Sequence, residues 1–396
     1  MLYEHNRCRI EFPPILMKHI LIAHQSTIPH YRVPFYNALE LLKPDSWRFD
    51  VVFDPSELTS PQFFNEPLKR EDFHFSVLET KTRLMKVFGK KVAYQTFWSK
   101  ASQYDLVVVE HAVNNLTYPL CQLHQFKGVK LAYWGHGRDY SIETKRGLKL
   151  VAERLKLWLA HNADGFFAYT DGGRDYLVGQ GLASEKIFVL NNTIDIQHQR
   201  DVYAKYSSER QAIRQRLGVA DQRVLLFVGR FTPNKRLDLL LESFRTLRQS
   251  SDMYHLILVG DGYLPSNLND QNGVSHLGAV VDLDELGPLY VASDLFVFPG
   301  SVGLGPLQAL CYDLPILTID SSTHMPEFEY LNSANSIVLS PRTSPQDYAH
   351  AIIDLFETRE KLQRLQSSIW STICHLTIEQ MAYRFIQGVD TILVNK

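Results

Sequence analysis

The sequence predicts an α/β protein built from two facing Rossmann-like domains with parallel sheets. Short apolar runs alternate with amphipathic stretches along the whole chain. The runs are apolar on both faces, which is typical of parallel strands covered by helices. The 396 residues also exceed what one ordinary hydrophobic core holds, so we expect two domains.

We expect two series of strands. The first comprises 20–23, 49–53, 106–110, 130–134, 165–169 and 187–190, and the second 224–228, 255–259, 295–298, 316–319 and 336–339. The connecting segments have apolar residues at helical spacing, as in Leu237, Leu240, Leu241, Phe244 and Leu247. Such alternation implies doubly wound sheets, which bind ligands beyond the carboxyl ends of their strands.

A polar stretch at 196–222, rich in Gln, Arg and Ser, separates the two series, and we expect the interdomain connection there. The predicted division is an N-terminal extension at 1–17, a first domain at 18–200 and a second domain at 201–375. A C-terminal helix at 376–396 would pack back on the first domain.

Composition excludes several classes of protein. The formal net charge of −2 gives no overall field that would recruit nucleic acid. The chain has no apolar run of the ~18 residues that a membrane span needs, and its N-terminus lacks the apolar stretch of a signal peptide. Its cysteines lack disulfide or metal-ligand spacing, which favours the cytoplasm, a reducing compartment. They are Cys8, Cys121, Cys311 and Cys374.

Two turns in the second half predict a diphosphate site. The strand 224–228 ends at Gly229 and Arg230, whose planar guanidinium suits phosphate oxygens, and Lys235 adds a second positive charge. The strand 295–298 runs into a glycine loop and a helix, where the amides of 303–305 are available to an anion. Alternatively, the first turn carries solvated cations and the second needs glycine only for packing.

The ordered motifs of the chain resemble glycosyltransferase family 4. The resemblance begins near Lys18 and covers nearly all of the chain from that residue onward. It includes 28–34 (IPHYRVP), 134–137 (WGHG), 169–173 (YTDGG), 187–195 (IFVLNNTID), Gly-Arg-x4-Lys from Gly229, 260–262 (GDG), the glycine loop and 324–327 (HMPE). The resemblance implies the GT-B architecture and a retaining mechanism. It also implies a nucleotide-sugar donor in the second domain and an acceptor in the first.

One departure from the family pattern concerns the glycine loop. Most family members carry two glutamates eight positions apart, and the matching positions here are Gly300 and Gln308. We expect Gln308 to hydrogen-bond a ribose without charge. Backbone groups or Glu327 would replace the first acid. The donor-binding prediction therefore comprises Gly229, Arg230, Lys235, Gly303, Leu304, Gly305, Gln308 and Glu327.

Further candidates follow predicted strands of the first domain. His136, between two glycines, matches the family's cleft histidine and is our catalytic candidate; a structural turn histidine is the alternative. His30, Arg32 and His111 are acceptor-side candidates. We find no Asp-x-Asp sequence at a predicted strand end, so we expect neither a metal nor a cofactor. Without an evident carboxylate nucleophile, retention favours front-face attack in which the leaving phosphate takes the acceptor proton.

Two basic clusters with apolar residues between them lie in the first domain. One comprises Lys81, Arg83, Lys86, Lys90, Lys91 and Lys100 with Phe88, Tyr94, Phe97 and Trp98. The other comprises Lys145, Arg146, Lys149, Arg154 and Lys156 with Leu148, Leu155, Leu157 and Trp158. Such a face suits an anionic membrane surface. Ordinary amphipathic helices with solvated lysines are the alternative.

The sequence therefore predicts a cytoplasmic, peripherally membrane-bound glycosyltransferase of the hexosyltransferase type. It would move a sugar from a nucleotide-sugar donor to a saccharide or lipid-linked glycan, in lipopolysaccharide or other surface polysaccharide biosynthesis. Two alternatives stay open: a nucleotide-sugar epimerase or hydrolase of the same architecture, and a non-catalytic nucleotide- or glycan-binding protein.

Overall fold

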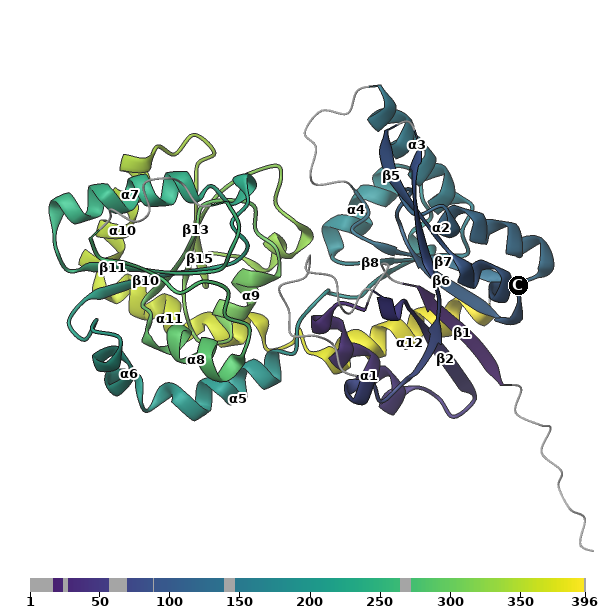
Figure 1. The fold of residues 1–396 in the computed structure, drawn as a ribbon, viewed down its shortest axis with the longest axis horizontal. Helices are drawn as coiled ribbons and strands as arrows, with labels where there is room; N and C mark the ends of the chain where they lie inside the picture. The colour runs from purple at the N-terminus through teal and green to yellow at the C-terminus, as the bar shows by residue number, and fades with distance from the viewer. Residues whose placement is uncertain are drawn as a thin grey trace, which may run out of the picture.

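The computed structural model describes residues 17–23, 28–56, 70–87, 89–138, 147–263 and 272–394. The chain forms two lobes, each an α/β unit, joined by two crossing segments (Figure 1). The residues 1–16 of the predicted N-terminal extension lie outside the described part, as do Phe88, Lys145 and Arg146 of the basic clusters.

The first lobe is built on a parallel sheet that has seven strands among the described residues, in the order β3-β2-β1-β6-β7-β8-β9. The strands are β1 (Lys18–Ala23), β2 (Trp47–Phe53), β3 (Ser76–Glu79), β6 (Leu106–Glu110), β7 (Lys130–Gly135), β8 (Gly165–Ala168) and β9 (Ile187–Val189). Its helical segments are η1 (His30–Arg32), α1 (Val33–Leu42), η3 (Arg70–Asp72), η4 (Thr96–Gln103), α2 (Thr117–Leu120), η5 (Cys121–Lys127), α3 (Leu148–His161), α4 (Asp171–Gly179) and η6 (Ser184–Lys186). An antiparallel hairpin of β4 (Thr82–Val87) and β5 (Lys90–Gln95) lies beside the sheet.

The second lobe is built on a parallel sheet of six described strands, in the order β12-β11-β10-β13-β14-β15. They are β10 (Arg223–Val228), β11 (Tyr254–Val259), β12 (Val274–His276), β13 (Leu295–Phe298), β14 (Ile316–Ile319) and β15 (Ser336–Leu339). The helical segments are α5 (Ile196–Ser207), α6 (Arg210–Arg216), η7 (Pro233–Lys235), α7 (Leu237–Ser250), α8 (Leu283–Ala292), α9 (Leu304–Leu310), η9 (Pro326–Tyr330), α10 (Pro345–Glu357) and α11 (Arg359–Ile373). The predicted apolar stripe of α7 is buried. The two-sheet α/β prediction is therefore confirmed.

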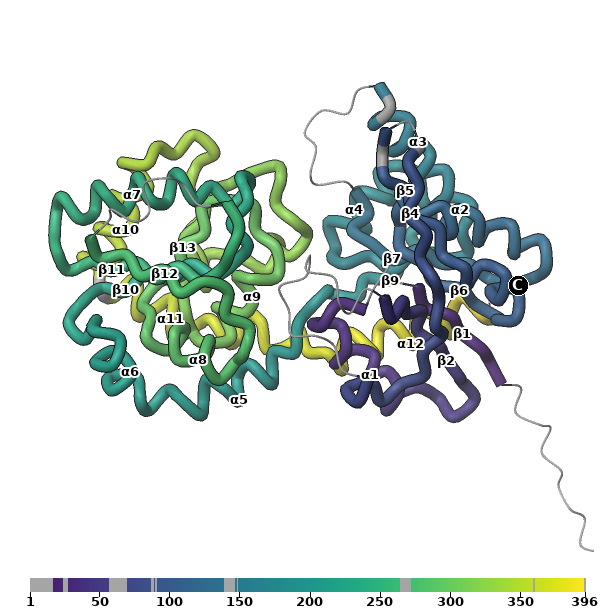
Figure 2. Tube along the Cα trace, in the orientation of Figure 1, coloured from purple at the N-terminus to yellow at the C-terminus, as the bar shows by residue number. Residues whose placement is uncertain are grey.

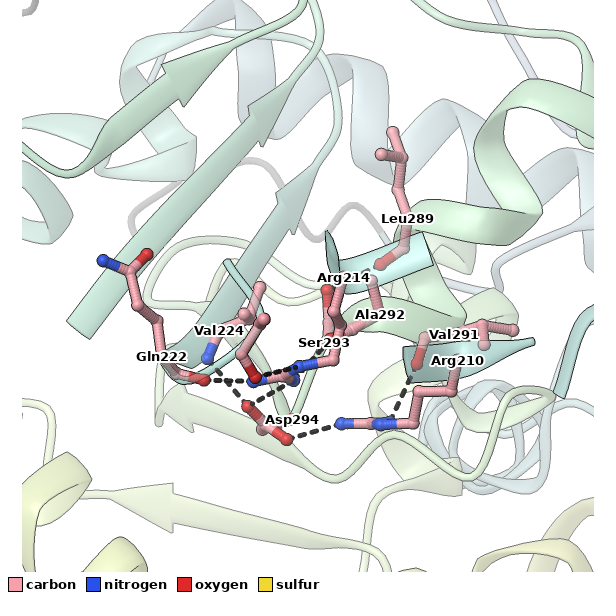
Figure 3. Close-up of polar contacts among 10 residues, drawn as sticks. Arg210, Arg214, Gln222, Val224, Leu289, Val291, Ala292, Ser293 and Asp294 are labelled. Carbon is pink, nitrogen blue, oxygen red and sulfur yellow. Dashed lines mark hydrogen bonds and ion pairs between the residues drawn. The ribbon is translucent and has the colours of Figure 1, made fainter. Parts of the chain in front are cut away.

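The segment 196–222, which we expected to connect the domains, forms α5 and α6 of the second lobe. Arg210 and Arg214 of α6 bind the two carboxylate oxygens of Asp294, at 2.5 and 3.1 Å, and Arg214 also binds the carbonyl of Ala292 (Figure 3). Asp294 in turn accepts a hydrogen bond from the amide of Val224, where β10 begins, at 2.7 Å. This segment has few apolar residues because arginine-to-carbonyl and arginine-to-carboxylate bonds attach α6 to the sheet.

The last helix, α12 (Ile378–Val394), crosses back to the first lobe and packs along α1 (Figures 1 and 2). Met381, Phe385 and Val389 lie in the core of that lobe. The two crossing segments touch, since the Thr193 hydroxyl donates to the carbonyl of Leu376 at 2.7 Å. The lobes are therefore joined by a paired connection, while the exact domain boundaries stay a prediction.

Candidate functional site

A cavity of about 650 Å³ lies between the lobes, at the carboxyl ends of β10 and β11. Its second-lobe wall includes the loop residues 228–230 and 259–261, the segment 279–283 that leads into α8, His198 and Gln199 of α5, and Gln308 of α9. The first lobe contributes His30, Tyr31 and Pro34. Of the predicted site residues, the structure thus brings Gly229, Arg230, Gln308 and His30 to one cavity.

Close contact between two strand ends shapes the floor of this cavity. A Cβ atom on Gly260 would lie 2.0 Å from the carbonyl oxygen of Gly229, and Gly260 has φ = +144°. Beyond these glycines, Phe231 pairs with Gly262 in a parallel bridge, and its amide donates to the carbonyl of Asp261 at 2.8 Å. The Gly-Asp-Gly motif therefore holds the Gly-Arg loop in place and leaves the exposed Arg230 at the cavity.

Lys235 lies at the end of η7, behind the glycine loop. Its Nζ donates to the carbonyl oxygen of Ser301 and lies 5.0 Å from the centroid of the Phe298 ring. Burial, assisted by the charge of Arg230, lowers the pKa of Lys235 to about 8, while the charge of Glu327 opposes this shift. The two predicted cations are thus near neighbours, but Arg230 is the one that the described cavity wall includes.

Gly300 lies where the family resemblance places a glutamate, and the structure leaves no room there for a side chain. A Cβ atom at this position would lie 2.3 Å from the Cα and carbonyl carbon of Lys235, and 2.4 Å from the carbonyl oxygen of Asn234. The neighbouring amide of Ser301 donates to that same Asn234 oxygen at 2.8 Å. The two loops therefore meet through their backbones, and any side chain at position 300 would separate them.

The glycine loop ends where α9 begins. Gly303 is the residue before Leu304, the first helical residue, so the amides of 303–305 belong to the first turn and lack acceptors within the helix. Gln308 is half-buried, and its Nε2 donates to Oε1 of Gln199 on α5 at 3.2 Å. The same oxygen accepts from the Tyr312 hydroxyl at 3.1 Å. An amide at position 308 therefore has a donor role that a carboxylate lacks.

Glu327 and Arg32, predicted to bind substrate, lie in one buried network between the lobes. Asn192 joins them: its Nδ2 donates to the Glu327 carboxylate at 2.5 Å, and its Oδ1 accepts from the Arg32 guanidinium at 2.6 Å. Arg32 is fully buried, with its Cζ 5.1 Å from the centroid of the Trp134 ring. Burial raises the pKa of Glu327, while its bond with Asn192 opposes the rise. In this structure Arg32 supports the lobe contact rather than lining the cavity.

A second carboxylate reaches across from η9. Glu329 accepts hydrogen bonds from the Thr170 hydroxyl at 2.8 Å and from the Gly172 amide at 2.9 Å. These groups stand at the start of α4, where a negative charge is favourable. Three motifs quoted for the family resemblance, at 169–173, 187–195 and 324–327, thus meet in the contact between the lobes.

His136 follows β7 and is half-buried, with its ring 4.4 Å from the Tyr169 ring. Close packing accounts for at least one of its two flanking glycines. A Cβ on Gly137 would lie 2.6 Å from the carbonyl oxygen of Gly173, and Gly137 has φ = +81°. At least this glycine allows the His136 loop to pack against the start of α4.

His111 is buried, and its Nε2 lies 2.9 Å from the carbonyl oxygen of Lys156. Burial lowers its pKa to about 4, so the ring is neutral and Nε2 donates to that carbonyl. His111 thus helps to anchor α3.

The preceding residue, Glu110, was not a sequence candidate, although burial raises its pKa to about 7 against the charge of Lys156. Its position at the end of a predicted strand is the sequence feature that could have marked Glu110 as a candidate.

The described ranges contain no group of three or more His, Cys, Asp or Glu side chains that could hold a metal ion. They also contain no helix that is long and apolar enough to cross a membrane.

Comparison with known proteins gives one family match, to "Glycosyl transferases group 1" over residues 222–358. The chain is 28% identical to spore coat protein SA of Bacillus subtilis over 175 residues, which are 39% of this chain and 45% of the relative. It spans about half the length of the curated relatives that it matches.

Solved structures share the fold over almost the whole chain. Anabaena HepE in complex with UDP superposes with a TM-score of 0.66 and 17% identity, covering 94% of this chain and all of that one. The UDP-GlcNAc 2-epimerase of Neisseria meningitidis, bound to UDP-GlcNAc, gives 0.59 and 14%, covering 94% and 99%. The protein therefore has the two-lobed GT-B fold, and its second lobe carries a domain similar to the group 1 glycosyl transferases.

Proposed function

We propose that this protein is a retaining glycosyltransferase of family 4. It would move a hexose from a nucleotide-sugar donor to a saccharide or lipid-linked glycan, in lipopolysaccharide or other surface polysaccharide biosynthesis. The observation that carries the proposal is the cavity between the lobes, with Arg230 and Gln308 in its wall. The family match over residues 222–358 and the UDP bound by the structurally similar HepE support a nucleotide-sugar donor.

In this proposal the donor diphosphate lies between Arg230 and the amides of 303–305. Negative charge grows on the departing diphosphate as the sugar–oxygen bond breaks, and fixed positive charge in a partly dry cleft stabilises it. Lys235 adds to that field from behind the glycine loop. Because these two side chains supply the charge, we propose that the transfer requires neither a metal nor a cofactor.

The nucleoside would extend along the other end of the cavity, toward the segment 279–283. Since Nε2 of Gln308 is bound to Gln199, its carbonyl oxygen is the group that would accept a hydrogen bond from a ribose hydroxyl. Gly300 has no side chain for the sugar, so backbone groups of the glycine loop would replace the missing glutamate.

The acceptor would approach from the first lobe, past His30 and Tyr31. We propose front-face attack, in which the leaving phosphate takes the acceptor proton, with His136 positioned near the sugar. We assign Arg32 and His111 to the supporting structure, because both are buried. A cytoplasmic location, in peripheral contact with the membrane, fits a lipid-linked acceptor.

The test uses a panel of nucleotide sugars, first in thermal-shift binding and then in transfer assays. Arg230→Ala and Lys235→Ala should each lower kcat/KM by roughly 10²–10³-fold, as expected for removing a group that stabilises transition-state charge. Arg245→Ala is the matched control, because Arg245 is an exposed cation of α7 outside the described cavity wall. Unaltered turnover in both site variants would refute the assignment.

The similarity to a UDP-GlcNAc 2-epimerase keeps a second enzyme class under test. An epimerase converts the nucleotide sugar in the absence of an acceptor. The product formed when the protein is incubated with nucleotide sugar alone therefore distinguishes an epimerase from a glycosyltransferase. A binding protein would retain the donor and release no nucleotide diphosphate when an acceptor is added.

A further inference from the structure

Helix α3 presents apolar side chains to solvent on one face. Leu150, Val151, Leu155 and Trp158 fall at helical spacing on one side, and Val151 and Trp158 are 61% and 58% exposed. The opposite side is the packed one, where Glu153 and Ala160 are buried. Surface helices normally place polar residues toward water, so this exposed apolar side indicates an interaction site.

The apolar surface continues onto the neighbouring 3₁₀ helix η5. Gln122 and Gln125 of η5 donate to the carbonyls of Leu159 and Asn162, at the end of α3, at 2.9 and 3.0 Å. Beside these bonds η5 exposes Leu123 and Phe126, and Phe126 is 90% exposed.

The β4–β5 hairpin extends the surface further. The amide of Leu116, just before α2, donates to the carbonyl of Ala93 on β5 at 2.8 Å. The hairpin exposes Leu84, at 70%, and Met85. Together α3, α2 and the hairpin gather at one end of the first lobe (Figures 1 and 2).

Exposed cations lie on the same elements or directly beside them in the chain. They are Lys81, Arg83, Lys86, Lys91, Lys127, Lys149 and Arg154. Glu153 is the acidic residue of the hairpin, η5 and α3, and it is 8% exposed and bound to the Tyr176 hydroxyl at 2.9 Å. We call these cations, together with Leu84, Met85, Leu123, Phe126, Leu150, Val151, Leu155 and Trp158, the apolar–basic face. It is strongly positive in a chain whose net charge is −2.

We propose that the apolar–basic face docks the protein on an anionic lipid bilayer. Apolar and aromatic side chains enter the headgroup boundary, while lysine and arginine pair with lipid phosphates. Arg154 lies among the apolar residues of α3, and its long side chain can keep its charge at the phosphates while its stem stays among apolar groups. A second copy of the chain fits less well, because a symmetric contact through this face would oppose cations to cations.

Docking deepens the proposed function, since it would hold the enzyme beside a lipid-linked acceptor, but the exposed apolar–basic face is present whatever the reaction. The full chain is tested by flotation with phosphatidylcholine vesicles, with and without phosphatidylglycerol. Binding should require phosphatidylglycerol and weaken as salt rises. The double variant Lys149→Gln/Arg154→Gln should bind about 30-fold more weakly, from about 1 kcal/mol for each cation. Trp158→Ser should also weaken binding.

The matched control is Lys361→Gln/Arg364→Gln, which removes two exposed cations from α11 of the second lobe. Equal vesicle binding by the α3 variant and wild type would overturn the proposal, as would no binding by wild type. If wild type is a dimer and the α3 variants are monomers, a second copy of the chain is the occupant. If wild type binds an acidic protein saturably and has no affinity for lipid, the occupant is a protein partner. Either result would overturn the proposal.

Nucleotide-sugar affinity, measured without vesicles, separates this inference from the proposed function. The α3 variants should keep wild-type donor affinity and wild-type thermal unfolding. Vesicle binding without any donor binding would leave docking intact and reject the glycosyltransferase assignment.

Discussion

Replacing Gly300 by alanine tests whether the two loops of the donor site must meet through their backbones. The new Cβ would lie 2.3 Å from the backbone of Lys235, whereas ordinary contact begins at 3.4 Å, so the loop 234–235 must move by about 1 Å. That shift would stretch the 2.8 Å bond from the Ser301 amide to Asn234. Overpacking of this kind costs about 2–3 kcal/mol. The Tm should fall by roughly 4–12 °C.

The same shift would displace the Lys235 ammonium from its position behind the glycine loop. A misplacement of about 1 Å at a catalytic group can lower activity by ~10²-fold. Calorimetry and donor-dependent turnover measure the two effects. Gly305→Ala is the control for stability, because its Cβ would lie no closer than 3.7 Å to its nearest neighbour. Wild-type Tm and turnover in Gly300→Ala would show that the two loops tolerate a side chain between them.

Further predictions concern charge at the site and between the lobes. Because the pKa of Lys235 is about 8 in the folded protein, against an ordinary 10.5, donor affinity measured by calorimetry should weaken as pH rises through 8. Lys235→Arg should remove that dependence. In the absence of donor, Lys235 of the unfolded chain is still protonated between pH 8 and 10.5, whereas Lys235 of the folded chain has lost its proton. The free energy of unfolding should therefore rise with pH across that interval. Asn192→Ala leaves Arg32 and Glu327 without their shared partner and should cost about 3–5 kcal/mol in urea unfolding. Glu327→Gln keeps an acceptor for Asn192 and should cost less than about 1 kcal/mol.

Strands buried on both faces were predictable from the sequence, whereas two of the four edge strands of the described sheets were not. Each of the eleven expected strands is present, because a continuous apolar run is a local signal. The structure adds β3 and β12, which lie at the edges of the two sheets and are partly exposed. Their residues, Ser-Val-Leu-Glu and Val-Ser-His, have no distinctive period over so short a length.

The basic cluster at 81–100 shows a different limit. We considered amphipathic helices as the ordinary alternative there, but the structure forms the β4–β5 hairpin and η4. Phe97, counted with the exposed aromatics, is 1% exposed and belongs to the core. Pattern alone could not assign it, because it belongs to a core cluster whose other members include β1 and β7 residues distant in the sequence.

At the candidate site, local geometry was predictable and contact between the lobes was not. A glycine and an arginine at a strand end identify the cavity wall because both follow from one strand–turn unit. Arg32 looked equally accessible, since it also follows a strand. The burial of Arg32 depends on Asn192, 160 positions away, and on α12, whose Met381 sulfur lies 3.4 Å from the Arg32 guanidinium. No short-range sequence pattern indicates a partner so distant in the chain.

The buried network changes how activity losses should be interpreted. Arg32 and Asn192 belong to motifs quoted for the family resemblance, yet they support the contact between the lobes and lie outside the described cavity wall. A variant that breaks this network should lose stability and activity together, even if neither residue touches a substrate. Glu327 differs, since its charge acts on Lys235 as well as on Asn192. Asn192→Ala and Glu327→Gln therefore form the informative pair. Loss of turnover with stability kept in Glu327→Gln would indicate that the carboxylate acts on the donor, whereas parallel loss of stability and turnover in Asn192→Ala would indicate support.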